Sequence, residues 1–131
     1  CNPRPLSISE DKSKSVFKCK IMEKHPYSSQ MFMPNTNEYK EDSYLVIVSL
    51  DDGEVEAFVF NSDQGVVYNK GVWHSPMCNI SEEIVSFVVM INETADADKK
   101  KWNCVEVASE FDVEFLMEMG IWISTPGIVF F

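Results

Sequence analysis

The chain has 131 residues, of which 45% are hydrophobic and 12% aromatic, and this composition excludes an intrinsically disordered protein. The length fits one domain spanning residues 1–131. With 21 acidic and 11 basic side chains, the formal net charge is -10, which argues against nucleic acid or an anionic membrane surface as a partner.

The N-terminal segment, residues 1–15, is rich in Pro, Ser, Asp and Lys and is expected to form a loose arm. From Val16 onward, short β-branched apolar runs alternate with polar breaks. Runs of this length fit strands better than helices. The predicted strands span residues 16–22, 30–33, 44–50, 55–60, 65–69, 84–91 and 104–108.

A β-hairpin is predicted over Tyr44–Phe60, because Asp51-Asp52-Gly53 has the composition of a tight turn with positive φ between two strands. Many short strands, separated by Pro, Gly and Asn, indicate an antiparallel sandwich or barrel whose closure protects the strand edges. The predicted fold class is therefore an all-β antiparallel barrel.

Three later segments depart from the strand pattern. Residues 92–101 (NETADADKKK) form a charged run between two strands, which is typical of a solvated surface loop. Residues 111–120 could form one or two helical turns. The apolar end, residues 120–131 (GIWISTPGIVFF), is expected to pack against the barrel or a partner subunit, because an exposed patch of that kind invites aggregation.

The cysteines Cys1, Cys19, Cys78 and Cys104 lie far apart in the chain and form no C-x-x-C pair. This spacing favours reduced thiols of a cytoplasmic protein. The sequence contains neither a signal-peptide pattern nor an apolar run long enough for a transmembrane helix. We therefore expect a soluble cytoplasmic protein.

The two histidines of the chain, His25 and His74, both lie in polar segments that look structured. Histidine changes its protonation state near neutral pH, and its neutral ring binds divalent metals. Glu23 and His25 are two residues apart, so they would point to the same face of a strand, with Gln30 five residues further on. Several polar side chains could then enter one barrel interior.

The two histidine segments together resemble the two cupin motifs. Glu23, His25 and Gln30 follow the spacing H-x-H-x(3,4)-E, and Asn69–His74 follows P-x-G-x-x-H with Asn in the proline position. The resemblance implies a ligand set of Glu23, His25, Gln30 and His74 for a divalent ion. Glutamine is a weak neutral donor, so metal affinity should be modest or absent. The alternative is that these polar residues satisfy one another in the interior.

A closer resemblance covers residues 16–108 and occurs in four separate blocks: EKHPYSSQMFMP (23–34), YLVIVSL (44–50), QGVVY with GVWH and Pro76 (64–76), and NCVE (103–106). These blocks look like the ureidoglycolate lyase family. The resemblance implies a cupin-type antiparallel β-barrel (a jelly roll, or double-stranded β-helix), often a homodimer. It also implies cleavage of (S)-ureidoglycolate to glyoxylate and urea in allantoin degradation, a branch of purine catabolism.

The chemistry implied by the resemblance suggests roles for particular residues. His74 or His25 would take the substrate hydroxyl proton as general base, and Lys70 would hold the carboxylate. Three further residues would orient the ureido group by hydrogen bonds: Glu23, Gln30 and Tyr68. If a divalent ion binds, it would acidify the hydroxyl, and the histidines would be ligands instead of bases.

Two other functions remain open at this level. A different metal-dependent cupin enzyme is one, because a fold does not determine its chemistry. The other is a catalytically inactive small-ligand-binding cupin, because three positions depart from the bacterial family pattern. The departures are Ser75 in place of histidine, Asn69-Lys70 in place of His-Arg, and Ile91-Asn92 in place of Asp-Arg. Lys70 could also be a solvated turn residue, and Tyr68 a pocket wall.

Overall fold

A computed structural model describes residues 7–8, 15–49, 53–115 and 127–131 of the chain. Within these residues it contains one short helix and eleven strands, joined by turns and loops. The elements are β1 (Ser7–Ile8), β2 (Ser15–Lys24), β3 (Ser29–Pro34), β4 (Tyr44–Ser49), β5 (Val55–Phe60), β6 (Gln64–Tyr68), β7 (Trp73–His74), β8 (Cys78–Asn79), β9 (Phe87–Asn92), α1 (Ala97–Lys101), β10 (Val105–Phe115) and β11 (Gly127–Phe130).

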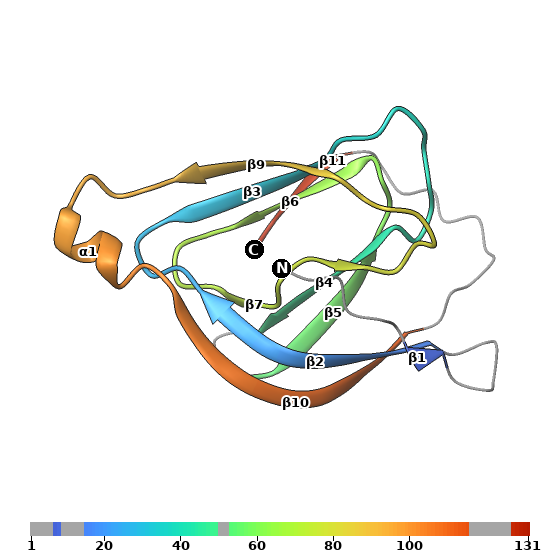
Figure 1. Cartoon of the computed structure of the whole chain (residues 1–131), viewed down its shortest axis with the longest axis horizontal. Helices are drawn as coiled ribbons and strands as arrows, with labels where there is room; N and C mark the ends of the chain where they lie inside the picture. Colours follow the sequence, from blue (N-terminus) through green and yellow to red (C-terminus); the bar gives the residue numbers. More distant parts are fainter. Residues whose placement is uncertain (1–6, 9–14, 50–52, 116–126) are drawn as a thin grey trace.

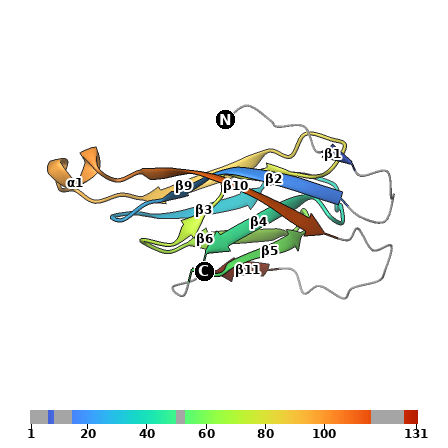
Figure 2. The same cartoon turned by 90° about the horizontal axis from the view of Figure 1, so that it is seen from below.

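The strands form two sheets that face each other (Figures 1 and 2). The larger sheet has the order β1-β2-β7-β4-β5, with β10 paired to β2 and β8 paired to β4. The smaller sheet has the order β11-β6-β3-β9. The pairs are antiparallel except β11 with β6, which is parallel. The prediction of an all-β antiparallel fold is confirmed, and the arrangement is consistent with a cupin-like fold.

The predicted hairpin is present as β4 and β5. Their register runs from Tyr44 opposite Phe60 to Ser49 opposite Val55. Gly53 has a φ of 84°, the left-handed conformation that favours glycine in a tight turn. Asp51 and Asp52, the other turn residues of the prediction, lie outside the described residues.

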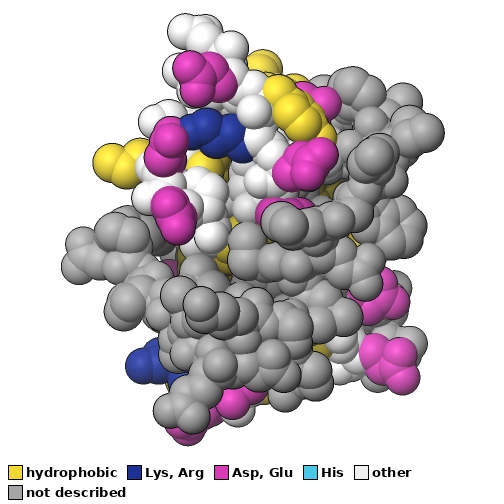
Figure 3. Space-filling model, turned by 90° about the vertical axis from the view of Figure 1, so that its right-hand side faces the viewer, with side chains coloured by type: hydrophobic (Ala, Val, Ile, Leu, Met, Phe, Trp, Pro, Cys, Tyr) yellow, Lys and Arg dark blue, Asp and Glu magenta, His cyan; other side chains and the backbone are white. Residues whose placement is uncertain are grey.

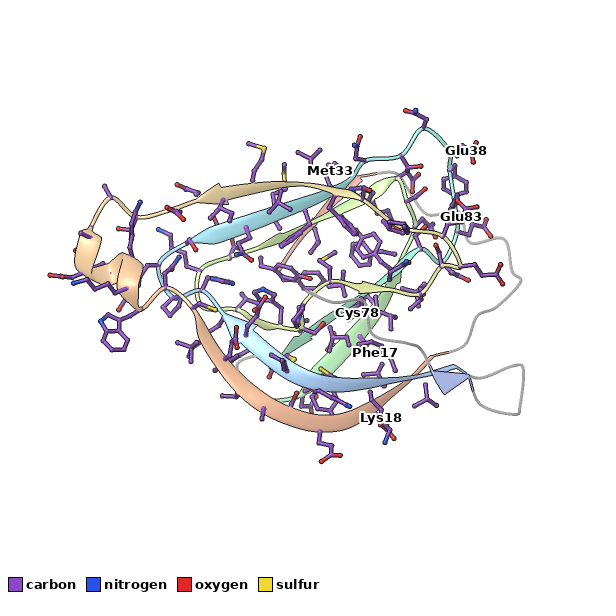
Figure 4. All side chains as sticks on the ribbon, viewed as in Figure 1. Phe17, Lys18, Met33, Glu38, Cys78 and Glu83 are labelled. Atoms are coloured by element: carbon purple, nitrogen blue, oxygen red, sulfur yellow. The ribbon has the colours of Figure 1, made fainter. Side chains whose placement is uncertain are left out.

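Strand β4 is buried on both faces, which explains why its sequence is continuously apolar instead of alternating. One face contributes to a core between the two sheets, the inter-sheet core: Tyr44, Val46, Val48, Phe60, Val66 and Tyr68. The other face contributes to a second core beneath strands β2 and β10, the β2–β10 core: Phe17, Cys19, Met22, Leu45, Ile47, Cys78, Ile80 and Val113. Phe17 and Cys78 point into this core, whereas Lys18 points away from it (Figure 4).

The prediction of helical turns after residue 110 is wrong for the described part, residues 111–115. They continue β10, which pairs with β2 as far as Phe115 opposite Ser15. In this stretch Phe111 and Val113 alternate with acidic residues, a period-two pattern that suits a strand lying over a core. Residues 116–120 lie outside the described residues.

The charged run 92–101 is exposed as predicted, but it also contains the helix α1, which sequence reasoning missed. The Asp96 side chain accepts hydrogen bonds from the amides of Asp98 and Lys99, so it caps the helix N-terminus. Figure 1 places α1 between β9 and β10, at the end of the molecule where β2 turns into β3.

The apolar C-terminus packs against the sheets in its described part, as expected. Strand β11 adds to β6, and the Phe131 ring lies 5.2 Å from the Phe58 ring and 6.5 Å from the Tyr68 ring, measured between centroids. Residues 120–126 lie outside the described residues. At the other terminus, β1 pairs with the start of β2, and the rest of the expected arm is likewise outside the described residues.

The end of the molecule opposite α1 carries acidic side chains (Figure 3). Glu38 and Glu83 lie there (Figure 4), and Lys40 forms an ion pair with Glu83.

No helix in the described residues is long and apolar enough to cross a membrane. Cys19 and Cys78 are buried and Cys104 is exposed, whereas Cys1 lies outside the described residues.

Replacing Leu45 by alanine should lower the free energy of unfolding by about 2–5 kcal/mol. Leu45 is 1% exposed in the β2–β10 core, so truncation leaves a cavity. Urea unfolding followed by tryptophan fluorescence measures the change. The control is Val55→Ala on the neighbouring strand, where the side chain is 43% exposed and the change should stay below about 0.5 kcal/mol. Equal losses in the two variants would contradict this assignment of the core.

Candidate functional site

Strand pairing brings the two histidine segments together. His74 lies on β7, opposite Glu23 of β2 on one side and opposite Val48 of β4 on the other. His25 directly follows the end of β2. The ring centroids of His25 and His74 are 5.6 Å apart. The structure therefore brings the two histidines close together.

Backbone carbonyls determine the tautomer of both rings. The Nδ1 atom of His74 lies 3.0 Å from the Val72 oxygen, and that of His25 lies 2.8 Å from the Asn103 oxygen. A carbonyl oxygen only accepts, so in each neutral ring Nδ1 carries the proton and Nε2 keeps its lone pair. Both Nε2 atoms are buried, and neither has a hydrogen-bond partner among the described residues.

Glu23 adds a carboxylate to the two imidazoles. Its Oε1 atom lies 3.7 Å from Nε2 of His74, and one ligand atom from each of Glu23, His25 and His74 lies within 4.8 Å of the other two. Two nitrogen lone pairs and a carboxylate oxygen form a donor set that suits a divalent transition metal. The Nδ1 hydrogen bonds to backbone carbonyls are the usual support of ligating histidines. The residues present thus fit an ion.

Gln30 and Tyr68 approach from the smaller sheet, where they lie opposite each other on β3 and β6. The Tyr68 ring stacks on His74 with 4.0 Å between centroids and 9° between planes. Its hydroxyl lies 3.8 Å from the Met77 sulfur, and burial raises the pKa of Tyr68 far above its usual value. The Gln30 Oε1 atom is buried and, like the two Nε2 atoms, has no hydrogen-bond partner in the described ranges.

The site keeps His74 neutral. Burial lowers the pKa of His74 to about 4; the hydrogen bond to the Val72 carbonyl opposes this shift, and the charge of His25 adds to it. Burial also raises the pKa of Glu23, with Glu106 acting in the same direction and His25 against it. At neutral pH, His74 therefore presents a lone pair and not a proton.

Lys70 lies in the turn between β6 and β7. The turn contains Gly71 with a φ of 81°, and the Gly71 amide donates to the His25 carbonyl at 3.0 Å. This contact places the turn beside the site, while the Lys70 side chain is exposed to solvent. Lys70 thus belongs to a turn that contacts the His25 segment, but its side chain is not one of the buried groups of the site.

Sequence reasoning missed the contribution of the segment after α1. Asn103 supplies the carbonyl that holds His25, and Glu106 of β10 lies directly opposite Glu23. Glu106 and Cys104 form a second, more exposed group with Glu23, in which burial and the two carboxylates raise the pKa of the Cys104 thiol. The only signal in the sequence was the NCVE block, which carries no information about its distance from His25.

Comparison with known proteins identifies related sequences. A family model described as ureidoglycolate lyase matches residues 1–115. The ureidoglycolate lyase of Saccharomyces cerevisiae is 38% identical over 94 residues, covering 66% of this chain and 48% of the yeast protein. That of Schizosaccharomyces pombe is 37% identical over 76 residues, covering 53% and 40%. That of Burkholderia mallei is 38% identical over 78 residues, covering 56% and 43%. The chain thus spans about half the length of these relatives, or less.

The buried neutral state of His74 should make stability depend on pH. Its pKa of about 4 in the fold is below the ordinary value of 6.5, so the unfolded chain binds more protons between these pH values. The free energy of unfolding should therefore fall as pH decreases from 6.5 to 4, by on the order of 3 kcal/mol at most. Urea unfolding across this range, with chelator present, measures the slope in wild type and in His74→Gln. A variant slope as steep as the wild-type slope would contradict this origin.

Proposed function

Since the chain belongs to the ureidoglycolate lyase family, we propose that it cleaves (S)-ureidoglycolate to glyoxylate and urea, a step of allantoin degradation. The observation that carries the proposal is the arrangement of His25 and His74, whose Nε2 lone pairs are buried beside the Glu23 carboxylate. Such a group of acceptors suits a small ligand rich in hydrogen-bond donors. Ureidoglycolate offers a hydroxyl and several ureido N–H groups.

The reaction requires two proton movements. The hydroxyl on the central carbon loses its proton, its oxygen forms a carbonyl, and the bond from carbon to the ureido nitrogen breaks with the electron pair going to nitrogen. The nitrogen then takes up a proton and leaves as urea. No water is consumed, so one group that accepts the first proton and returns it to nitrogen is sufficient.

His25 is the stronger candidate for this general base, and His74 the alternative. A base works best when its pKa lies near the operating pH, and the pKa of about 4 makes His74 a poor carrier of a proton at neutral pH. His74 is better suited to accept a hydrogen bond from the substrate hydroxyl through its fixed Nε2 lone pair. His25, only partly buried, has the same free Nε2 geometry and lies in the same site.

The other predicted residues complete the binding site. The Gln30 amide oxygen and the Glu23 carboxylate are acceptors for the ureido N–H groups, since Gln30 Oε1 is buried within the described structure without a partner of its own. Tyr68 serves as a wall that fixes the His74 ring by stacking, because its hydroxyl faces the Met77 sulfur. Lys70, exposed on the turn beside His25, would reach toward the substrate carboxylate from the solvent side.

A metal-dependent form of the enzyme is the second candidate. The donor atoms of Glu23, His25 and His74 would hold a divalent ion, with the Gln30 amide as a weaker fourth donor. Such an ion would supply Lewis-acid chemistry at the substrate hydroxyl. In that case both histidines would be ligands, and the proton would need another acceptor.

The cellular setting follows the same reasoning. We propose a cytoplasmic enzyme, supported by the wide spacing of Cys19, Cys78 and Cys104 in the sequence, which contains no C-x-x-C pair. We also propose a homodimer. The support for this state is the exposed apolar surface of β9, where Val88, Val89, Met90 and Ile91 are 46–60% exposed.

Purified protein incubated with racemic ureidoglycolate should release urea and glyoxylate in equal amounts. The variants His25→Ala and His74→Ala should each lower kcat/KM by about 10²–10⁴, because each loses a group that contacts the reacting hydroxyl. Urea and glyoxylate are measured separately, with ammonia as a third product. Ile84→Ala, whose side chain is 93% exposed, is the control and should retain wild-type turnover.

The same assay separates the two mechanisms. Activity that survives dialysis against chelator supports the histidine base, whereas activity that is lost and then restored by a divalent ion supports the metal form. Wild-type turnover in both histidine variants would contradict the site. Release of ammonia instead of urea would contradict the lyase reaction.

Lys70→Ala should raise KM by about 10-fold and change kcat little, since a charge-assisted hydrogen bond to the carboxylate acts in the bound state and the transition state alike. Initial rates over a range of substrate concentration give the two constants. Lys18→Ala removes another exposed cation, on β2, whose Nζ lies 3.9 Å from Asp112, and should leave KM unchanged. Identical KM values in the two variants would show that Lys70 is a solvated turn residue.

A further inference from the structure

We propose that Asn103 is a positioning residue for His25, holding its ring as the tautomer that can accept a proton at Nε2. The inference rests on the proposed function only for its effect on turnover. The hydrogen-bond geometry on which it depends is independent of the substrate. Asn103 stands between α1 and β10, far from His25 in the sequence.

Asn103 binds the His25 segment through both its backbone and its side chain. Its carbonyl oxygen accepts from His25 Nδ1 at 2.8 Å. Its Oδ1 atom accepts from the Tyr27 amide at 3.0 Å, and its Nδ2 atom donates to the Ser28 hydroxyl at 2.7 Å. One residue therefore makes hydrogen bonds to three of the four residues that connect β2 to β3.

The side-chain bonds are what keep the carbonyl in place. Ser28 is 1% exposed, so its end of the bond to the half-buried Asn103 is shielded from solvent. The amide offers one acceptor and one donor at a fixed separation, and these match the Tyr27 amide and the Ser28 hydroxyl. A shorter apolar side chain would leave both groups without this partner and release the backbone around residue 103.

The hydrogen bond at Nδ1 of His25 matters because a neutral imidazole can carry its proton on either of its two nitrogens. A fixed acceptor at Nδ1 keeps the proton there and leaves the lone pair at Nε2, toward Glu23 and His74. Loss of that acceptor would allow the tautomer with the proton at Nε2, which cannot act as the base. It would also allow the ring to turn away from His74.

The charged segment before Asn103 is anchored on the same turn. The Lys99 ammonium lies 5.9 Å from the centroid of the Tyr27 ring, so α1 contacts the turn that Asn103 binds. This segment looked like a solvated loop in the sequence, and its side chains are indeed exposed. Asn103, two residues after this segment, nevertheless orients a site histidine.

Asn103→Ala should lower kcat by about 10- to 100-fold, the usual cost of removing a group that orients a functional histidine, and should leave KM within about 2-fold. Asn103→Asp keeps the acceptor for the Tyr27 amide and lets the Ser28 hydroxyl donate, so it should recover most of the lost kcat. Lys99→Ala is the control from the same segment and should match wild type, because an exposed cation–π contact contributes little.

A spectroscopic measurement separates positioning from a general loss of structure. The chain has two histidines, so long-range nitrogen-15 spectra contain two rings, and His25→Gln assigns them. In wild type the neutral His25 ring should carry its proton at Nδ1, and Asn103→Ala should show a mixture of tautomers while His74 stays unchanged. An unchanged His25 pattern in Asn103→Ala would overturn the proposal, whether or not kcat falls.

Two further outcomes have defined meanings. If Asn103→Ala does not fold, Ser28→Ala replaces it, since that variant removes only the hydrogen bond to Asn103 Nδ2. A shift of the His25 tautomer in Ser28→Ala supports the proposal. An unchanged tautomer overturns it. If the wild-type protein does not turn over ureidoglycolate, the proposed function fails. The nitrogen-15 comparison still decides the role of Asn103.

Discussion

The site depends on the pairing of β2 with β7, where Glu23 lies opposite His74. This register places Nε2 of His74 3.7 Å from the Glu23 carboxylate and brings His25, just beyond the strand, to the same place. A slip of one residue would turn His74 toward the β2–β10 core and Trp73 toward the site. Because Glu23 is also paired with Glu106 of β10, one position of β2 links three strands of the site.

The two cores hold this register in place from both sides. Val48 of β4, opposite His74, belongs to the inter-sheet core, while Leu45 and Ile47 of the same strand belong to the β2–β10 core. A strand fixed on both faces has little freedom to shift. The Tyr68 ring then packs on the His74 ring from the smaller sheet, and burial keeps the His74 ring neutral.

The sequence predicted those elements that depend mainly on residues close together in the chain. The short apolar runs and the hairpin around Gly53 follow from strand geometry, and the structure agrees. Glu23 and His25 lie close together although His25 follows the end of β2, so strand alternation alone does not explain this contact. The extension of β10 through Phe115 was missed although Phe111 and Val113 alternate with acidic residues as in a strand. The hydrogen bonds from Asn103 to the His25 segment are tertiary as well, and no spacing in the chain encodes them. The resemblance to a known family indicated that these segments belong together, but it did not show what each residue does.

The electrostatics of the site constrain what it can bind. Its polar atoms are acceptors, in a chain of net charge -10: the buried Nε2 lone pairs of the two imidazoles, the buried Gln30 oxygen and the half-buried Glu23 carboxylate. Such a site favours donors or a cation and opposes an anion. For the proposed substrate, ureidoglycolate, which carries both donors and a carboxylate, this opposition predicts one orientation. The hydroxyl and ureido groups would face the acceptors, and the carboxylate would face outward, toward the exposed turn that carries Lys70.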